Sequence, residues 1–582
     1  MVEKIAIIEN KDQAKVFLKN KEQFKDYLPV TFSYEAEEIL LKSGVRFKMD
    51  DDYETEGIYE GLYKISLGIT NKISKEIKFY YRKIELFELF YQNLLIFIGN
   101  NLRHLKILEK IENDENPKKV LIFQRIKKNP EKEICSELAN KFFGDKKETR
   151  NYVIDNEKGV KEKLISFGGL IQKKISDVFL SFKKRKGIIL FDEGKHRGEF
   201  LLRELGKNKE ICLLRCHSRL QKGFFIKKRY LHFYQFFGKR NEQGKKLNLK
   251  INKFLIDKKN FSFLKKLGLN KLVLSQIESL IKYYFSNKFL EVSFTINHLI
   301  DFVQKYKIKA IIVFADTPTF EKILVKTGKL FKIPTFVLQH GSVGYELGFF
   351  PFSADYFIAF GEESKYRLKK FGIPEEKIFV LGHPQFERYS DINLEKKNKI
   401  VYVSSDANST NFLPEVDPSK KMQKDILRII FKTMKNFPNY KLVIRKRGKD
   451  WDMYNLSKQI AREENFKNLE IVDGKNLINL FKDSKITLIN NSTLALDSWI
   501  SKNKVISITF KELVNFFESP LTKSLKKVFN EKELERAISK TLKNKEDPEE
   551  FLKNRLTNKE NASKKIAEFI FEKISLIRKE FK

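Results

Sequence analysis

A histidine and a glycine follow a short apolar run in Ile333-Pro-Thr-Phe-Val-Leu-Gln-His-Gly341. If this run is a strand of an open α/β sheet, Gln339, His340 and Gly341 lie at its carboxyl end, where such sheets bind ligands. The imidazole of His340 can take up a proton near neutral pH, and Gly341 lets the backbone approach a substrate closely. The turn therefore predicts chemistry on a sugar or a phosphate, with His340 as a candidate for the proton transfer.

A second turn, Asn490-Asn491-Ser492-Thr493, separates a predicted strand at 487–489 from a helix that begins near Leu494. Hydroxyls and backbone N–H groups at a helix N-terminus form an anion site, helped by the helix dipole. The same residue types are the preferred N-caps, so ordinary capping explains the turn equally well. Asp497, one turn further on, either reaches a ribose or sugar hydroxyl or is a first-turn carboxylate that the dipole favours.

Polar residues end three more predicted strands. Ser404-Ser405 closes the first strand after residue 398, and Arg445-Lys446-Arg447 closes the next one. Three bases at one strand end suit a diphosphate better than a solvated face would require. His383, in Gly-His-Pro, faces the same crevice or belongs to a plain turn. Together these residues predict a donor-binding wall.

A rival for the proton lies in the loop Asp192-Glu193-Gly194-Lys195-His196-Arg197-Gly198, after a predicted strand at 188–191. A carboxylate at a strand end beside glycine can act as general base toward an acceptor hydroxyl. Glu193 and Asp192 are therefore the alternatives to His340, and an ordinary strand-to-helix turn is the other interpretation of the loop.

Apolar runs alternate with helical patterns along most of the chain, which is typical of parallel sheets covered by helices. The helix predicted at 34–43 ends at Gly44, a residue suited to a helix C-terminus. The predicted strands cover residues 5–8, 30–33, 45–47, 120–123, 152–154, 188–191, 211–214, 310–315, 335–338, 356–360, 378–381, 400–404, 441–445, 469–472, 486–489 and 504–508.

The simplest domain organisation from this pattern is two Rossmann-like α/β domains that are joined near residue 390 and closed by a C-terminal helix. Residues 1–390 form the first, acceptor-side domain, with an irregular, helical insertion at about 217–270 that is rich in Lys, Phe and Tyr. Residues 391–540 form the second domain, and residues 541–582 form a helical tail. No internal repeat of 20–50 residues interrupts this scheme.

The chain of 582 residues has a formal net charge of +38, and lysine greatly outnumbers arginine along its whole length. Codon bias with solvated faces explains this charge, and attraction to an anionic membrane or a polyanionic substrate is the functional alternative. Sequence-specific nucleic-acid binding is a third interpretation, but no recognition motif supports it.

Three cysteines, Cys135, Cys212 and Cys216, cannot form a disulfide framework, so we expect a reducing cytoplasm. Cys212, Cys216 and His217 lack a fourth nearby ligand, which favours apolar packing over zinc. No signal peptide precedes the first strand, and no run reaches the roughly 18 apolar residues of a spanning helix. The expected location is the cytoplasm, with contact at the inner face of the membrane.

These motifs, in this order and spacing, resemble the GT-B glycosyltransferase superfamily, in which two Rossmann-like domains bind a nucleotide-sugar between them. Residues 310–510 resemble the group of CDP-glycerol glycerophosphotransferases and capsule or surface-polysaccharide transferases. Where that group has a His-Pro pair after the second donor-domain strand, this chain has Arg445-Lys-Arg-Gly448. The segments that carry the resemblance are Ile333–Gly341, Gly382-His-Pro-Gln-Phe386, Val401-Tyr-Val-Ser-Ser405 and Leu488-Ile-Asn-Asn-Ser-Thr-Leu-Ala-Leu-Asp497.

The resemblance implies a metal-independent transferase that uses a UDP- or CMP-linked donor as substrate and no other cofactor. His340, or else Glu193 with Asp192, would deprotonate an acceptor hydroxyl on a glycan or lipid-linked acceptor. The implied donor-binding residues are Gly341, His383, Ser404, Ser405, Arg445, Lys446, Asn491, Ser492, Thr493 and Asp497. The alternatives are a UDP-sugar 2-epimerase with the same fold and a non-catalytic scaffold that binds nucleic acid or another polyanion.

Overall fold

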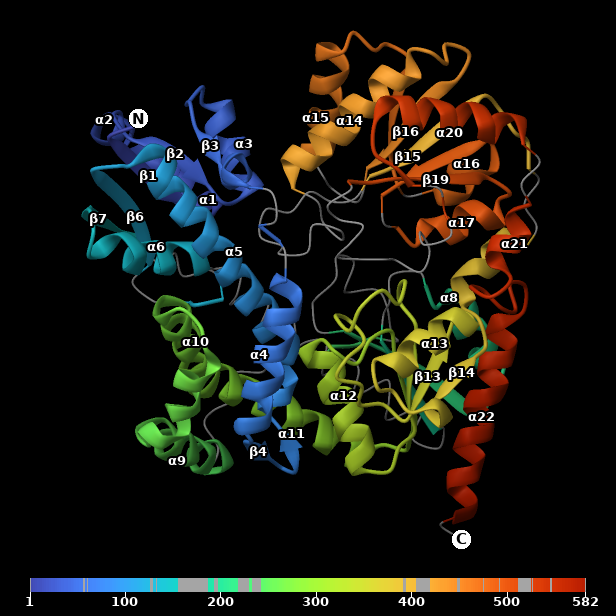
Figure 1. The fold of residues 1–582 in the computed structure, drawn as a ribbon. Coiled ribbons are helices and arrows are strands. Elements are labelled where there is room, and N and C mark those ends of the chain that lie inside the picture. Colours follow the sequence, from blue (N-terminus) through green and yellow to red (C-terminus); the bar gives the residue numbers. More distant parts are fainter. Residues whose placement is uncertain are drawn as a thin grey trace.

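The computed structural model contains three large parallel sheets (Figure 1). It describes residues 2–55, 58–59, 61–125, 129–131, 133–154, 187–192, 197–217, 230–232, 242–390, 394–404, 419–446, 451–474, 476–490, 492–510, 525, 527–544 and 547–580. Among these residues, no helix is long and apolar enough to cross a membrane.

The first sheet has five strands in the order β3-β2-β1-β6-β7, all parallel. Helices on both faces cover it, as the sequence pattern predicts for buried parallel strands. The strands are β1 Lys4–Ile8, β2 Leu28–Thr31, β3 Lys48–Met49, β6 Lys119–Arg125 and β7 Glu148–Ile154; the helices of this part are α1 Lys11–Lys19, α2 Lys21–Phe24, α3 Tyr34–Lys42, α4 Leu62–Glu76, α5 Tyr91–Glu115 and α6 Ile134–Gly144, and a small hairpin joins β4 Tyr80–Tyr81 to β5 Ile84–Glu85.

The second sheet has seven parallel strands in the order β10-β9-β8-β11-β12-β13-β14. Its strands are β8 Gly187–Asp192, β9 Ile211–His217, β10 Tyr230–His232, β11 Ile308–Val313, β12 Thr335–Leu338, β13 Tyr356–Ala359 and β14 Ile378–Val380. Its helices are α8 Glu199–Gly206, α9 Glu242–Ile256, η4 Lys258–Leu267, α10 Lys271–Tyr283, η5 Tyr284–Lys288, α11 Phe289–Lys305, α12 Thr319–Leu330 and α13 Glu362–Lys370, followed by η6 Glu375–Lys377 and η7 Pro384–Tyr389.

The third sheet has six parallel strands in the order β17-β16-β15-β18-β19-β20. Its strands are β15 Lys399–Val403, β16 Lys441–Lys446, β17 Leu469–Asp473, β18 Ile486–Ile489, β19 Lys504–Ile508 and β20 Lys527–Val528. Its helices are α14 Lys420–Met434, α15 Trp451–Glu463, α16 Leu477–Lys482, α17 Leu494–Ile500 and α20 Glu531–Lys543, and the tail carries α21 Pro548–Leu552 and α22 Ala562–Glu580.

One continuous apolar core joins the first sheet to the second. It runs from Ile5 and Val120 of the first sheet, through α5, α10 and α11, to Ile311 and Val337 of the second. Residues 1–390, expected as one Rossmann-like domain, thus contain two separate sheets around a common core. The second and third sheets carry the predicted site residues, and the first is a third parallel sheet that the sequence pattern did not separate.

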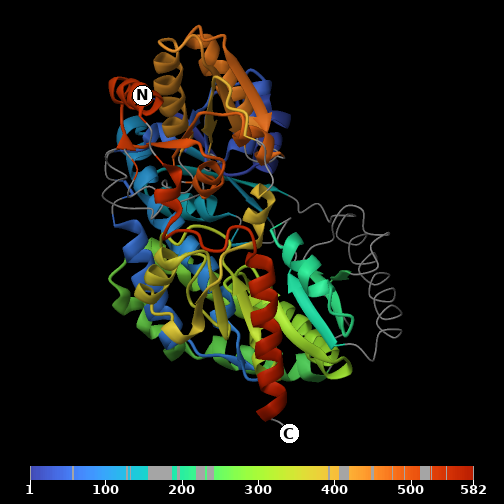
Figure 2. The same ribbon diagram turned by 90° about the vertical axis from the view of Figure 1, so that its right-hand side faces the viewer.

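The tail helix α22 returns from the third sheet to the second. Figure 2 shows it running alongside the second sheet, and its buried residues Ile566 and Ile570 share a core with Ile312, Phe336 and Leu338. The segment before α22 is equally close to the second sheet, because a side chain at Gly382 would collide with the backbone of residue 557. The tail therefore ties the two Rossmann-like units together.

The first sheet's region also contacts the third sheet through polar groups. The hydroxyl of Tyr34 accepts a hydrogen bond from the backbone N–H of Lys420 at 2.6 Å, and Asp51 accepts one from the N–H of Lys421 at 2.9 Å. The Lys420 ammonium pairs with Glu37 in the same buried contact. Since these N–H groups belong to the first turn of α14, the first region caps that helix from outside.

The substitution Ile566→Ala tests the role of α22. Because Ile566 is fully buried against the second sheet, we expect the free energy of unfolding to fall by about 2–5 kcal/mol. Urea unfolding followed by circular dichroism measures the change. The matched control is Glu568→Ala on the exposed face of the same helix, which should alter stability by less than about 0.5 kcal/mol. Equal effects of both substitutions would contradict the packing role of α22.

Candidate functional site

All three large sheets have the same strand order, with the first three strands in reverse and the fourth beside the first, and the predicted residues lie on the second and third sheets. The order reverses between β8 and β11 in the second sheet, and between β15 and β18 in the third. Open α/β sheets bind ligands at this point, outside the carboxyl ends of the strands. The predicted residues follow strands next to or at these points, so the topology gathers them at two sheet edges.

His340 follows β12 directly, in a turn that Gln339 fixes. The buried Gln339 side chain accepts a hydrogen bond from the N–H of Phe360 at 2.7 Å and donates one to the carbonyl of Gly341 at 2.7 Å. Nδ1 of His340 lies 3.0 Å from the carbonyl oxygen of Phe314, and the ring stacks on Phe349 with centroids 4.7 Å apart. The imidazole is therefore held in one orientation from both sides.

This geometry sets the protonation state of His340. A carbonyl only accepts, so Nδ1 carries the proton in the neutral ring and Nε2 keeps a free lone pair. Burial and the nearby Arg197 lower the pKa of His340 to about 4. Gly348, whose φ is +87°, leaves room beside Nε2, since a side chain there would lie 3.2 Å from that nitrogen. At neutral pH the ring is a proton acceptor that points into this space.

The loop after His340 is anchored on the second sheet and reaches the first region. Buried Asp316 accepts a hydrogen bond from the N–H of Ala354 at 2.9 Å, and buried Lys322 donates to the carbonyl of Pro351 at 3.0 Å. From the first region, the Tyr63 hydroxyl donates to Glu346 at 2.7 Å. The extra N-terminal region thus helps to position the loop that carries Gly348.

The hydroxyl turn of the third sheet meets the His340 turn. A methyl group placed on Gly341 would lie only 3.8 Å from Cγ2 of Thr493. Thr493 is the N-cap of α17 but makes no side-chain capping bond, whereas Ser492 accepts a hydrogen bond from the N–H of Leu494 at 3.3 Å. Capping therefore explains Ser492, and the Thr493 hydroxyl is not used in that way. Asn491 lies outside the described residues.

Asp497 binds two residues of η7, the short helix in the segment between the second and third sheets. One of its carboxylate oxygens accepts from the Tyr389 hydroxyl at 2.7 Å and pairs with the Arg388 guanidinium. Asp497 is buried, and both partners belong to η7 or flank it. The expected contact with a ribose or sugar hydroxyl has to share a carboxylate that already links α17 to η7.

His383 occupies a buried turn. Its Nδ1 accepts a hydrogen bond from the N–H of Gln385 at 3.2 Å, which makes it the N-cap of η7. Its ring packs against Phe360, with centroids 5.1 Å apart, and burial, with Arg197 nearby, lowers its pKa well below the usual value. Nε2 is buried without a partner among the described residues. A plain turn explains the hydrogen bond of Nδ1. It does not explain why Nε2 is buried without a partner.

The bases at the end of β16 are directed toward β17. Lys446 pairs with Asp473 at 2.8 Å, and the Arg445 guanidinium lies directly over the backbone of Gly474, where a side chain would meet it. The Ser404 hydroxyl donates to the Arg445 carbonyl at 2.9 Å and is buried. These contacts hold the sheet edge together, so the expected diphosphate contacts of this group remain predictions. Ser405 and Arg447 lie outside the described residues.

Asp192 is the last residue of β8, at the carboxyl edge that the second sheet shares with His340. Glu193 lies outside the described residues. Arg197, which the sequence analysis did not select, donates from Nη1 to the His340 carbonyl at 2.7 Å. It lowers the pKa values of His340 and His383 alike. The signal in the sequence that could have identified Arg197 is its position in the loop that follows Asp192.

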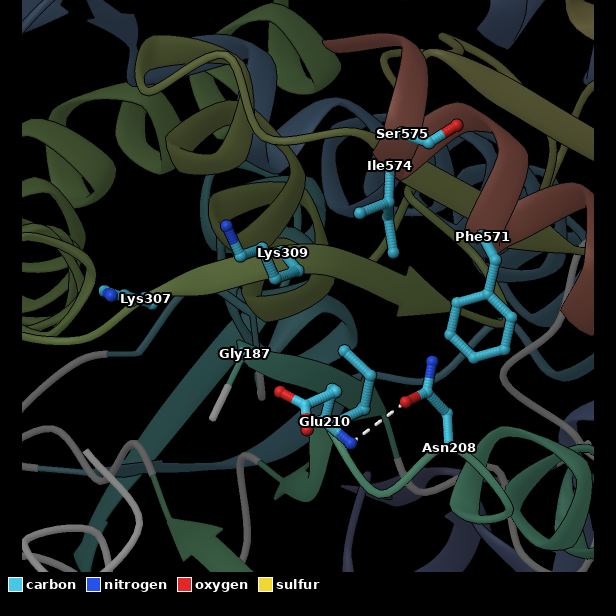
Figure 3. A pocket seen from close by; sticks show the side chains of 9 residues that line it. Gly187, Asn208, Glu210, Lys307, Lys309, Phe571, Ile574 and Ser575 are labelled. Carbon is cyan, nitrogen blue, oxygen red and sulfur yellow. Dashed lines mark hydrogen bonds between the residues drawn. The ribbon is translucent and has the colours of Figure 1, made fainter. Parts of the chain in front are cut away.

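A pocket of about 330 Å³ lies elsewhere, at the amino edge of the second sheet. Figure 3 shows Lys309 beside Ile574 and Ser575 of α22, and Asn208 accepting a hydrogen bond from the N–H of Glu210. Because this pocket is at the strand ends opposite His340, it is not the predicted site. Among the described residues, no three His, Cys, Asp or Glu side chains form a metal-binding group.

Comparison with known proteins gives a distant likeness of fold. No protein-family model and no curated protein sequence matches this chain. Similar solved structures are a UDP-N-acetylglucosamine 2-epimerase from Rickettsia bellii (13% identity, 68% of this chain and 100% of that chain, TM-score 0.43), a UDP-GlcNAc 2-epimerase from Neisseria meningitidis bound to UDP-GlcNAc (16%, 66% and 100%, 0.41) and the wall teichoic acid polymerase TagF (12%, 71% and 97%, 0.38). Because this likeness concerns the fold alone, the function has to be inferred from the geometry of the chain itself.

Replacing Arg197 by Ala should raise the pKa of His340 above 4 but not fully to 6.5, because burial remains. Imidazole nitrogen shifts in a pH titration by NMR measure it. An unfolded histidine titrates near 6.5, so the unfolded chain takes up the proton first and the fold loses stability as pH falls from about 6.5 to 4. This loss should be smaller in the Arg197→Ala variant. The control is Arg203→Ala, at an exposed position of α8. An unchanged pKa of His340 in the Arg197→Ala variant would show that Arg197 does not lower it.

Proposed function

We propose that this protein is a GT-B glycosyltransferase that moves a sugar, or a glycerol-phosphate-like group, from a nucleotide-activated donor to a glycan or lipid-linked acceptor. The observation that supports it most is the meeting of His340-Gly341 with Thr493. It places the turn that carries His340 next to the hydroxyl turn of the other Rossmann-like sheet, at the edges where such sheets bind ligands.

In this proposal Nε2 of His340 removes the proton of the acceptor hydroxyl as that oxygen attacks the donor. The bond from the donor's transferred group to the nucleotide phosphate breaks, and the nucleotide leaves with the bonding electrons. The Thr493 hydroxyl and the Arg197 charge stabilise the negative charge that develops on the leaving phosphate. Glu193 remains the alternative base, and the reaction needs no metal ion in this scheme.

A pKa of about 4 makes His340 a weak base in the free protein. A bound donor changes this, because a phosphate dianion beside the ring favours the protonated form and offsets the charge of Arg197. Donor binding would therefore move the pKa of His340 toward neutrality, where general bases work best. The base is activated only when the donor is in place.

The donor is UDP- or CMP-linked in this proposal, and the protein acts in surface-polysaccharide synthesis in the cytoplasm. A panel of UDP-, CMP- and GDP-sugars with CDP-glycerol, assayed for nucleotide release, identifies the donor. Isomerised UDP-sugar without nucleotide release would instead indicate the 2-epimerase. Salt-sensitive RNA binding without nucleotide binding would indicate the non-catalytic scaffold.

The substitution His340→Gln should lower kcat by about 10²–10⁴, the usual contribution of a general base. Donor affinity, measured by calorimetry, should stay within about threefold, since Gln keeps a polar side chain of similar reach. His298→Gln on α11 is the matched control and should leave kcat unchanged. Unaffected turnover in His340→Gln would transfer the role to Glu193, which Glu193→Gln then tests.

Saturation with the donor nucleotide should raise the pKa of His340 by at least about one unit above its value in the free protein. The NMR titration used for the free protein measures this directly. A variant with Thr493→Val should need more nucleotide to reach the same shift, because a phosphate contact is lost. An unchanged or lowered pKa at saturation would contradict a phosphate beside the ring.

A further inference from the structure

The segment from Gly244 to Lys271, which covers α9 after its first two residues and all of η4, carries charge of almost one sign. It contains nine lysines, no arginine and a single acidic residue, Asp257. All nine lysines are exposed. Figure 1 shows α9 at the lower left, at the end of the molecule far from the third sheet. Such a concentration of exposed positive charge fits a partner with dense negative charge.

Helix α9 has two distinct faces. Its inner face packs on the protein, with Leu247 and Ile251 buried and Phe254 stacked on Phe285 at 4.3 Å between centroids. On the outer face, Leu249 is 68% exposed and Ile256 is 80% exposed. These two residues are seven positions apart, almost two full turns, so they lie on one stripe. Apolar side chains thus stand in the middle of the lysine-rich face.

The β4–β5 hairpin extends this surface. Phe79, just before β4, contacts Phe254 of α9 edge-on at 5.9 Å, which places the two elements side by side. The next residue, Tyr80, is 55% exposed. Tyrosine is a residue that membrane–water interfaces favour, because its ring is apolar and its hydroxyl is polar.

We propose that the α9 surface, formed by Tyr80, Leu249, Ile256 and the exposed lysines of residues 245–271, docks the protein onto a membrane of anionic lipids. The lysines contact the headgroup phosphates, while Leu249 and Ile256 enter the boundary of the acyl chains. The net charge of the chain indicates membrane contact without locating it, and the proposal assigns that contact to the α9 surface. The proposal does not depend on the reaction at His340.

The chemistry of the surface favours lipid over nucleic acid. Single-stranded nucleic acid is bound by exposed aromatic rings that stack on bases, and duplexes are read largely through arginine. The α9 surface includes a single aromatic ring, that of Tyr80, beside the exposed aliphatic side chains of Leu249 and Ile256, and residues 244–271 contain no arginine. Aliphatic side chains gain nothing from a phosphate backbone, but they lose contact with water when they enter a bilayer.

Sedimentation with vesicles tests the proposal. We expect the full chain to bind vesicles of phosphatidylglycerol and phosphatidylcholine (3:7), and not pure phosphatidylcholine, with binding that weakens as salt rises. Changing four lysines of α9 to Gln should weaken binding at least about 100-fold, since each lysine contributes about fivefold near an anionic surface. Leu249→Ser with Ile256→Ser should weaken it about tenfold. The lysines changed are Lys245, Lys246, Lys250 and Lys253.

Matched controls carry the same changes on α1 and α2, at the upper left of Figure 1. Changing four exposed lysines there to Gln should reduce vesicle binding less than about fivefold, and so should Leu41→Ser, which alters a residue 56% exposed on α3. Nucleotide release from a soluble donor should be unchanged in every variant. The control lysines are Lys15, Lys19, Lys21 and Lys25, all exposed.

Three results would overturn the proposal: no binding of the full chain to anionic vesicles, equal loss in the control variants, or loss of RNA binding with vesicle binding intact. A second measurement does not rely on loss of function. In an Ile256→Trp variant, the added fluorescence should shift to shorter wavelength when anionic vesicles are added, because the ring leaves water. An unshifted spectrum under conditions where the protein sediments with vesicles would also exclude this surface.

Discussion

The parallel arrangement of the strands is the constraint on which this structure depends. Each crossover helix returns the chain to the same end of the sheet, so the turns that follow successive strands share one edge. For this reason His340 and Asp192 lie at the same edge of the second sheet, and Ser404 and Thr493 lie at the same edge of the third. A site between the two sheets also requires that their carboxyl edges face each other. The buried link from Asp497 to Arg388 and Tyr389 contributes directly to that orientation.

The strands were the most predictable part of the fold. Strands β12, β18 and β19 have the bounds that the apolar runs predicted, because a strand buried on both faces is apolar throughout. The separation of the first sheet was not predictable in this way. Strand order is set by contacts between residues far apart in the chain, and an alternating pattern is the same whether its strands join one sheet or two. The expected strand at 45–47 lies instead at Lys48–Met49, in a short edge strand with little apolar signal.

The candidate site shows a similar division. The position of His340 at a strand end followed from local sequence, but its tautomer depends on the carbonyl of Phe314, which is 26 residues away. The position of Lys446 at a strand end predicted a phosphate ligand, but in the structure Lys446 pairs with Asp473 of the neighbouring strand. Arg197 belongs to no motif of its own, and the carboxylates of Asp192 and Glu193 in the same loop are the residues whose types indicate proton transfer. Which charges are paired is decided by strand neighbours, and the sequence does not reveal those neighbours.

The return of α22 to the second sheet has a consequence for synthesis of the chain. Ile189, Ala310, Phe336 and Ile358 form a face of that sheet that α22 covers. The last strand of the sheet, β14, ends at Val380, and α22 begins at Ala562. At ribosomal rates, about 10–40 s separate the two. During that time α8 already packs on this face through Leu201 and Leu205, while the part that α22 covers stays open to water. The apolar core of the second sheet is therefore completed only after the third sheet has been made.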